Sequence, residues 1–210
     1  VYTGSDKKTR LDVAREFQKV KYRGPDNTRI EDFGDRGWMG FHRLKIMDVS
    51  DDGNQPMRYR HISLICNGEV YNYPQLLDEY RDRFDFESES DCEVIIPMFL
   101  EKGIKETARA LDAEFVCVIY DEEKEQFFAA RDPIGIRPMF YGYTSKGEIM
   151  FASEMKALHS MCEEVKAFPP GHYYEEGKIL PFTDISRVES FSSDEVEKVT
   201  RKINHYLTKG

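Results

Sequence analysis

The sequence predicts an α+β fold in which two β-sheets pack face to face and helices cover their outer surfaces. Short apolar runs of strand length dominate the chain and are interrupted by a few helical patterns. One run, residues 115–119, is apolar at every position, which is typical of a strand buried on both faces. With 210 residues and 40% hydrophobic content, the chain is long enough for one sizeable core and short for two.

The first predicted helix lies near the start of the chain. Val13, Phe17 and Val20 recur at i, i+4 and i+7, and the turn-forming residues 23–26 end the pattern. Residues 1–2 are apolar and precede another turn, so we expect the chain to start within a strand.

Six strands are predicted, and the last two form a hairpin. They cover residues 38–44, 62–66, 115–120, 126–130, 139–143 and 148–151. Two helices interrupt them. One follows Asn72 and has Pro74 in its first turn. The other follows a predicted capping box, in which Ser90 and Glu93 satisfy amides at the helix start.

A last helix carries an apolar stripe on an otherwise basic surface. The stripe consists of Val196, Val199, Ile203 and Leu207. The helix either leads into a second domain outside this chain or docks back on the same domain. We expect residues 1–190 to form the main domain and residues 191–210 to be a linker helix.

The composition excludes several classes of function. The formal net charge is -9, and no basic stripe suited to nucleic acid is present. No apolar stretch approaches the roughly 20 residues that cross a bilayer, and the start lacks an export signal. We expect a cytoplasmic protein without nucleic-acid or membrane partners.

The cysteines and histidines follow no metal-binding spacing. The four cysteines stand far apart without a C-x-x-C pair, and the five histidines form no H-E-x-x-H arrangement. We therefore expect reduced thiols and no metal site.

The first candidate site is Asn67-Gly68, at the end of an apolar run. A side-chain amide beside a glycine N–H can stabilise a developing oxyanion, as acyl transfer requires. The alternative is a plain turn after a strand, since Asn-Gly is a common turn dipeptide.

Three charged residues form a second candidate set. Arg43 could hold a carboxylate through its planar fork, helped by downstream backbone amides, or simply lie along the surface. Glu69 and Asp91 could hold an ammonium group, although Asp91 could equally stabilise a helix start. Together the three would match an amino-acid zwitterion. Residues 131–138, with two prolines and a glycine, are interpreted as a rigid structural turn.

At this point the chain resembles the glutamine-dependent asparagine synthetases. The resemblance extends to about Phe182 and rests on six ordered blocks, at residues 23–26, 42–44, 67–72, 90–93, 131–138 and 153–158. The turn with two prolines is also similar to that of amidophosphoribosyltransferases. The N-G-E-V-Y-N and S-E-M-K-A-L blocks favour the asparagine-synthetase branch.

The resemblance implies the four-layer αββα sandwich of amino-terminal-nucleophile hydrolases and a glutamine amidotransferase (glutaminase) activity. In that family an amino-terminal cysteine attacks the glutamine amide and releases ammonia. Carried over by resemblance, Asn67 and Gly68 form the oxyanion hole. Arg43, with the backbone of Ile46 and Met47, holds the glutamine carboxylate, and Glu69 and Asp91 hold its amine. Arg23 would line the same pocket.

The sequence departs from the family at its start, because the opening cysteine is not among these residues. Cys66 is interpreted as a core residue, and the acidic neighbours of Cys92 oppose a thiolate there. We expect that the sequence is trimmed rather than degenerate and that, as given, it binds glutamine without hydrolysing it.

The resemblance also implies partners outside this chain. A synthetase domain in the same parent chain would use ATP and Mg²⁺ to amidate aspartate, whereas the glutaminase domain itself needs no cofactor. A homodimer is compatible with this interpretation. The alternatives are a non-catalytic glutamine-binding regulatory domain and the glutaminase domain of another amidotransferase.

Overall fold

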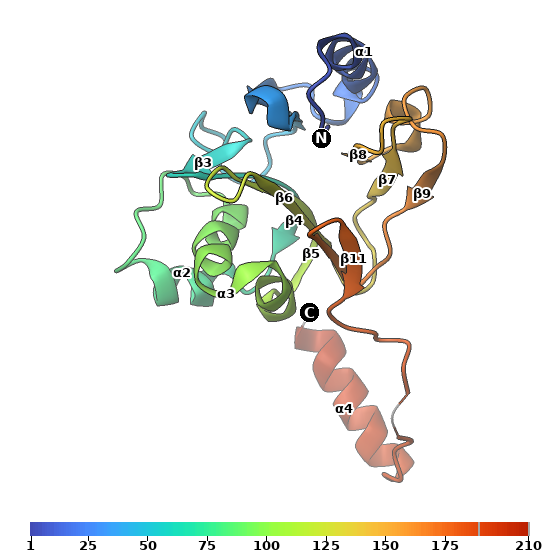
Figure 1. Cartoon of the computed structure of the whole chain (residues 1–210). Helices are drawn as coiled ribbons and strands as arrows, with labels where there is room; N and C mark the ends of the chain where they lie inside the picture. The colour runs from blue at the N-terminus through green and yellow to red at the C-terminus, as the bar shows by residue number, and fades with distance from the viewer. Residues whose placement is uncertain (189, 210) are drawn as a thin grey trace.

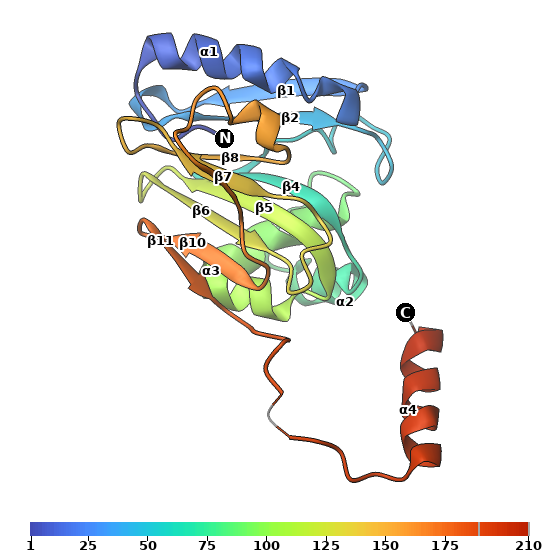
Figure 2. The same cartoon turned by 90° about the vertical axis from the view of Figure 1, so that its right-hand side faces the viewer.

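Four layers make up the molecule, in the order helix, sheet, sheet and helices (Figure 2). The computed structural model describes residues 1–188 and 190–209. In the larger, fully antiparallel sheet the strand order is β11 (Lys178–Pro181), β10 (His172–Glu175), β6 (Gln126–Arg131), β5 (Ala113–Asp121), β4 (Ile62–Val70) and β3 (Met57–Tyr59). Its outer face is covered by α2 (Tyr73–Tyr80) and α3 (Ile95–Ala110), which follows the short helix η3 (Asp91–Val94) (Figures 1 and 2).

The second sheet has two parts that meet at the start of the chain. One part pairs β1 (Asn27–Asp32) with β2 (Trp38–Arg43), and the other has the order β8 (Ile149–Ala152), β7 (Phe140–Tyr143) and β9 (Val165–Ala167). Tyr2 forms isolated bridges to Trp38 on one side and Met150 on the other. Helix α1 (Lys7–Gln18) covers the outer face of this sheet (Figure 2). The predicted αββα sandwich is confirmed.

Strand β5 shows why the core needs two sheets. Phe115, Cys117 and Ile119 pack into the core on the helix side, whereas Val116 and Val118 pack between the sheets. Successive side chains of a strand point to opposite faces, so an unbroken apolar run requires a cover on both. The predicted burial of this run is confirmed.

The structure corrects two local predictions. Strand β4 continues to Val70 and pairs with β5 along its whole length, so Asn67-Gly68 lies inside a strand and forms no turn. The capping box is also wrong, because Ser90 makes no side-chain cap. The Glu93 carboxylate instead accepts the backbone amides of Glu87 and Ser88, each at 2.8 Å, and so holds the preceding loop.

Five short strands were missing from the sequence prediction: β1, β3, β9, β10 and β11. Their residues are largely polar or exposed, as in Asn27–Asp32, so they show no apolar alternation. Pairing with a neighbouring strand makes them strands.

The turn at residues 131–138 is built around one buried carboxylate. Asp132 Oδ1 accepts the amides of Ile134, Gly135 and Ile136 at 2.5–3.1 Å, and its side chain is almost fully buried. Arg131 in turn donates to the carbonyl oxygens of Gly135 and residues 137 and 168. This turn is the rigid structural element that the sequence predicts.

We expect Asp132→Asn to lower the free energy of unfolding by about 1–2 kcal/mol, because the charge-assisted component of these buried hydrogen bonds is lost. Urea unfolding followed by circular dichroism measures the change. Asp82→Asn, at an exposed position, is the matched control. Equal stabilities of the two variants would contradict this account of the turn.

Helix α4 (Val196–Lys209) stands away from the sandwich at the end of an extended segment (Figure 2). Its apolar stripe is exposed, with Val196 80%, Ile203 54% and Leu207 76% accessible. The described conformation therefore does not show the helix docked back on the same domain. Across the described ranges, no helix has both the length and the apolar character needed to span a bilayer.

Candidate functional site

A cavity of about 560 Å³ collects every residue that the sequence proposes for the site. Its lining includes Arg23, Arg43, Ile46, Met47, Asn67, Gly68, Glu69 and Asp91. These residues come from the short helix η1 (Lys21–Arg23), β2, β4, η3 and the segment that follows β2, which are distant in sequence. Residues of both sheets, such as Val118 and Met150, complete the wall, and Val1 also lines the cavity.

The free edge of β4 presents one backbone donor to this cavity. The Cys66 N–H donates to Gln55 Oε1 at 2.6 Å, and the Val70 N–H donates to Asp91 Oδ2, also at 2.6 Å. The Gly68 amide lies between them and points the same way, because strand amides alternate in direction. No side chain among residues 1–188 and 190–209 accepts a hydrogen bond from it.

The neighbouring Asn67 side chain points into the space between the sheets. On β4 the even-numbered residues Leu64, Cys66 and Val70 belong to the core on the helix side, so the odd-numbered Asn67 faces the opposite way. Position 68 requires glycine, since a Cβ there would lie 2.4 Å from the Glu114 carbonyl oxygen. An amide side chain and an adjacent N–H thus approach the cavity from one strand.

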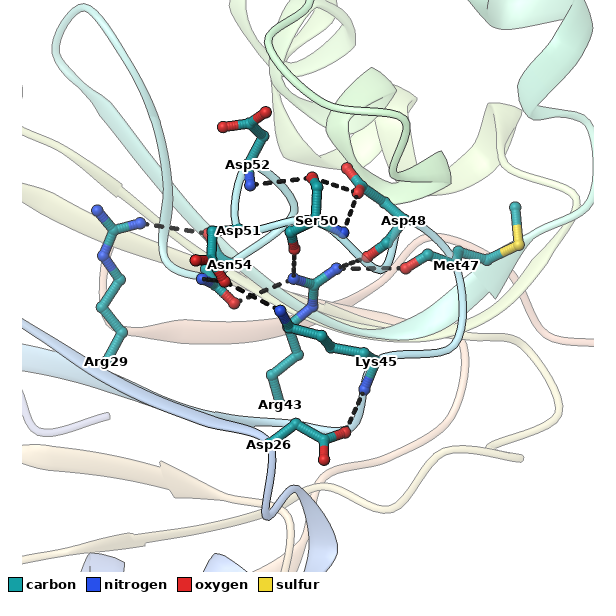
Figure 3. A network of polar contacts seen from close by, with 10 residues as sticks. All are labelled: Asp26, Arg29, Arg43, Lys45, Met47, Asp48, Ser50, Asp51, Asp52 and Asn54. Atoms are coloured by element: carbon teal, nitrogen blue, oxygen red, sulfur yellow. Dashed lines mark hydrogen bonds and ion pairs between the residues drawn. The ribbon is translucent and has the colours of Figure 1, made fainter.

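Arg43 lies at the end of β2, and its guanidinium is enclosed by the loop that follows (Figure 3). Nη1 donates to Ser50 O at 2.8 Å and to Asn54 Oδ1 at 3.0 Å, and Nη2 donates to the carbonyl oxygens of Met47 and Asp48. A guanidinium has five N–H donors, so the loop uses four of them. Arg43 therefore shapes the loop that contains Ile46 and Met47, and a carboxylate would have to share or displace these contacts.

The two carboxylates of the candidate site are neighbours in space. Asp91 is buried and accepts the amide of Val70, the residue that follows Glu69. Glu69 is exposed at the rim of the cavity. Two carboxylates that lie close together attract a cation. An ammonium group is therefore the ligand that Glu69 and Asp91 fit.

Arg23 lies at the cavity wall, in an ion pair with Glu154 at 3.2 Å. The sequence does not indicate that Glu154 pairs with Arg23. It also missed Asn54 and Gln55, two buried amides that bind Arg43 and the β4 edge. An Asn-Gln pair before a proline is ordinary loop sequence, and only the tertiary contacts distinguish it.

Two of the four buried cysteines, Cys66 and Cys92, also line the cavity, and the Cys92 thiol lies 3.9 Å from the Gly68 carbonyl oxygen. Cys66 and Cys117 lie in the core on the helix side of the sheet, so the interpretation of Cys66 as a core residue is confirmed. The adjacent thiol of Cys92, together with burial, raises the pKa of Cys66 well above its ordinary value, and burial raises that of Cys117 to about 12. Within the described parts of the chain, no group of three His, Cys, Asp or Glu side chains could hold a metal ion.

We expect all four cysteines to react with a disulfide reagent at pH 8 more than about 100-fold slower than a free thiol, because the thiolate is the reactive form. All four are buried, and burial also raises the pKa of Cys162 to about 11. Ellman's reagent with and without guanidinium chloride measures the difference. Rapid labelling of Cys66 in the folded chain would contradict its assignment as a buried core residue.

Comparison with known proteins gives a consistent family. Residues 1–168 match the family model described as a glutamine amidotransferase domain. A probable glutamine-hydrolysing asparagine synthetase of Acanthamoeba polyphaga mimivirus is 42% identical over 162 residues, which cover 75% of this chain and 29% of the relative. Asparagine synthetase B of Escherichia coli (strain K12) is 39% identical over 168 residues, covering 78% of this chain and 30% of the relative. The chain thus spans less than a third of these relatives.

Solved structures agree on the fold. A glutamine phosphoribosylpyrophosphate amidotransferase from B. subtilis, complexed with ADP and GMP, superposes with a TM-score of 0.73 at 19% identity. The match covers 87% of this chain and 48% of that one. At this identity the similarity describes the fold alone.

Proposed function

Because this chain belongs to the glutamine amidotransferase domain family, we propose that it is the glutaminase part of an asparagine synthetase. Its reaction would convert glutamine into glutamate and ammonia. The 42% and 39% identical relatives, both named glutamine-hydrolysing asparagine synthetases, support this branch of the family.

One observation carries the proposal: groups of complementary chemistry line a single cavity. Asn67 and the Gly68 amide offer N–H donors, Glu69 and Asp91 offer negative charge, and Arg43 lines the same cavity. An amino acid with a side-chain amide presents the matching set, namely a carbonyl oxygen, an ammonium group and a carboxylate.

Each of these residues would have a separate role in the reaction. A thiolate attacks the amide carbon of glutamine, and the carbonyl oxygen becomes an oxyanion that accepts hydrogen bonds from Asn67 and the Gly68 N–H. The tetrahedral intermediate collapses as the nitrogen takes a proton and leaves as ammonia. Water then hydrolyses the γ-glutamyl thioester to glutamate and regenerates the thiol. Arg43 and its loop would orient the substrate carboxylate, and Glu69 and Asp91 would orient its ammonium group.

The proposal takes the nucleophilic cysteine from a chain segment that reaches the junction of the second sheet. Tyr2 bridges β2 and β8 at this junction, and Val1 lines the cavity. A strand between β2 and β8 would therefore lead into the cavity beside Asn67. Cys66, Cys92 and Cys117 all belong to the buried core on the helix side of the larger sheet, so the proposal does not assign this role to them.

In the whole protein, we propose that the ammonia serves a synthetase domain that amidates aspartate. That domain would use ATP and Mg²⁺, and α4 with its exposed apolar stripe would lead toward it. The cytoplasm is the proposed compartment, in keeping with four unpaired cysteines.

Calorimetric titration of the 210-residue chain with L-glutamine tests the proposal. We expect binding of L-glutamine and at least about tenfold weaker binding of D-glutamine and L-asparagine, because their ammonium or amide groups cannot reach the same partners. A chain that binds none of the three, or binds them equally, would overturn the assignment of the cavity.

A further inference from the structure

Asp48 joins two segments of the candidate site and uses both of its carboxylate oxygens to do so. Oδ1 accepts the amide of Ser50 at 2.9 Å and its hydroxyl at 2.5 Å. Oδ2 accepts the backbone amide of Glu89 at 2.9 Å. Asp48 itself is absent from the cavity lining, so its contacts concern the scaffold of the cavity.

The first segment is the Arg43 loop, residues 44–54. Besides enclosing the guanidinium, this loop is anchored where it starts, as the Lys45 amide donates to Asp26 Oδ2 at 2.9 Å (Figure 3). Its packing is tight at Gly53, where a Cβ would lie 2.3 Å from Arg43 Nη2 and 3.0 Å from Asp48 Oδ2. The loop therefore holds the Arg43 guanidinium and the Asp48 carboxylate in fixed positions relative to each other.

The second segment is the Asp91 segment, residues 86–91. Glu93 holds its first part through the amides of Glu87 and Ser88. Its last residue is Asp91, which caps the β4 edge. The bond from Glu89 to Asp48 thus links the segment that ends in Asp91 to the loop that encloses Arg43.

The backbone of Asp48 adopts a conformation of higher free energy, which its hydrogen bonds to the two segments stabilise. Its φ is 47°, in the left-handed region that Asp tolerates better than most residues. The hydrogen bond from Ser50 and, to a lesser extent, the Glu89 amide and Arg43 lower the pKa of Asp48, so the carboxylate is charged at neutral pH. Such conformations persist where surrounding contacts determine them, often at functional sites.

We propose that Asp48 is a positioning residue that fixes the separation between the carboxylate and ammonium ends of the bound amino acid. The inference rests on the proposed function, because it assumes that Arg43 and Asp91 face opposite ends of glutamine. When the hydrogen bond between Glu89 and Asp48 is present, the two segments are already correctly spaced before a ligand binds to both of them. Without this bond, the ligand must order one segment relative to the other.

Three ligands test this coupling in the 210-residue chain. L-glutamine carries both charged groups, 4-carbamoylbutanoate lacks the ammonium group, and 4-aminobutanamide lacks the carboxylate. The variants are Asp48→Asn and Asp48→Gly. Asparagine and glycine both accept a positive φ, so each variant removes the charged link without straining the backbone. Asp52→Gly, an acidic-to-glycine change at an exposed position of the same loop, is the control.

We expect both Asp48 variants to bind glutamine about three- to tenfold more weakly, because the one charge-assisted hydrogen bond that joins the two segments is lost. Each single-charge analogue should lose less than about twofold, because it engages only one segment. Equal losses for all three ligands, or no loss for glutamine, would overturn the coupling while leaving the glutamine site intact. Failure of the unmodified chain to bind glutamine would overturn the proposed function and this inference together.

Discussion

In a glutamine-hydrolysing form of the protein, Asn67→Ala is expected to lower kcat about 100-fold or more, with little change in KM. The Asn67 side chain points between the sheets beside the uncapped Gly68 amide. A donor aimed at an oxyanion acts mainly in the transition state, so its loss should appear in kcat. Steady-state glutamate release measures both constants.

The control for Asn67 is Asn204→Ala, an exposed change on α4. It should leave hydrolysis unaltered. A loss of tenfold or less for Asn67→Ala would assign the residue to strand geometry. A rise in KM at constant kcat would make it a ground-state binding residue instead.

Arg43→Ala is expected to lower the free energy of unfolding by about 2–4 kcal/mol and to abolish measurable glutamine binding. The sequence alone predicts a larger effect on binding than on folding. The structure adds a folding cost, because the side chain is 5% exposed and four acceptors in and around the loop lose their donor. Urea unfolding and calorimetric titration of the same samples separate the two effects.

Arg43→Lys separates charge from geometry. Lysine keeps the charge but not the planar fork, so it cannot reach the four acceptors together. We expect it to recover part of the stability and little of the binding. A lysine variant with full glutamine affinity would show that charge alone suffices and that the arrangement of the loop is unimportant.

The sequence predicted the fold class because its strongest signals are burial signals. The run at residues 115–119 required cover on both faces, and Val13 and Phe17 of the predicted apolar pattern pack from α1 into the core. It failed where a strand depends on its neighbour. The polar β1 has no alternation of its own, and β4 runs past Asn67-Gly68 because β5 pairs with it to Val70.

For the site, the sequence determined which chemical groups are present: a guanidinium, two carboxylates, and an amide next to a glycine. Their order along the chain also carried the family resemblance. Those properties belong to individual residues and short motifs, so no contact is needed to recognise them.

Only the tertiary structure decided how those groups are used. It enclosed Arg43 in carbonyl oxygens, capped the amides on both sides of Gly68, and linked Asp48 to Glu89. Each arrangement joins residues that lie apart in sequence or depends on the direction of a backbone N–H. Such directions are fixed by strand pairing and loop closure, which local residue patterns do not encode.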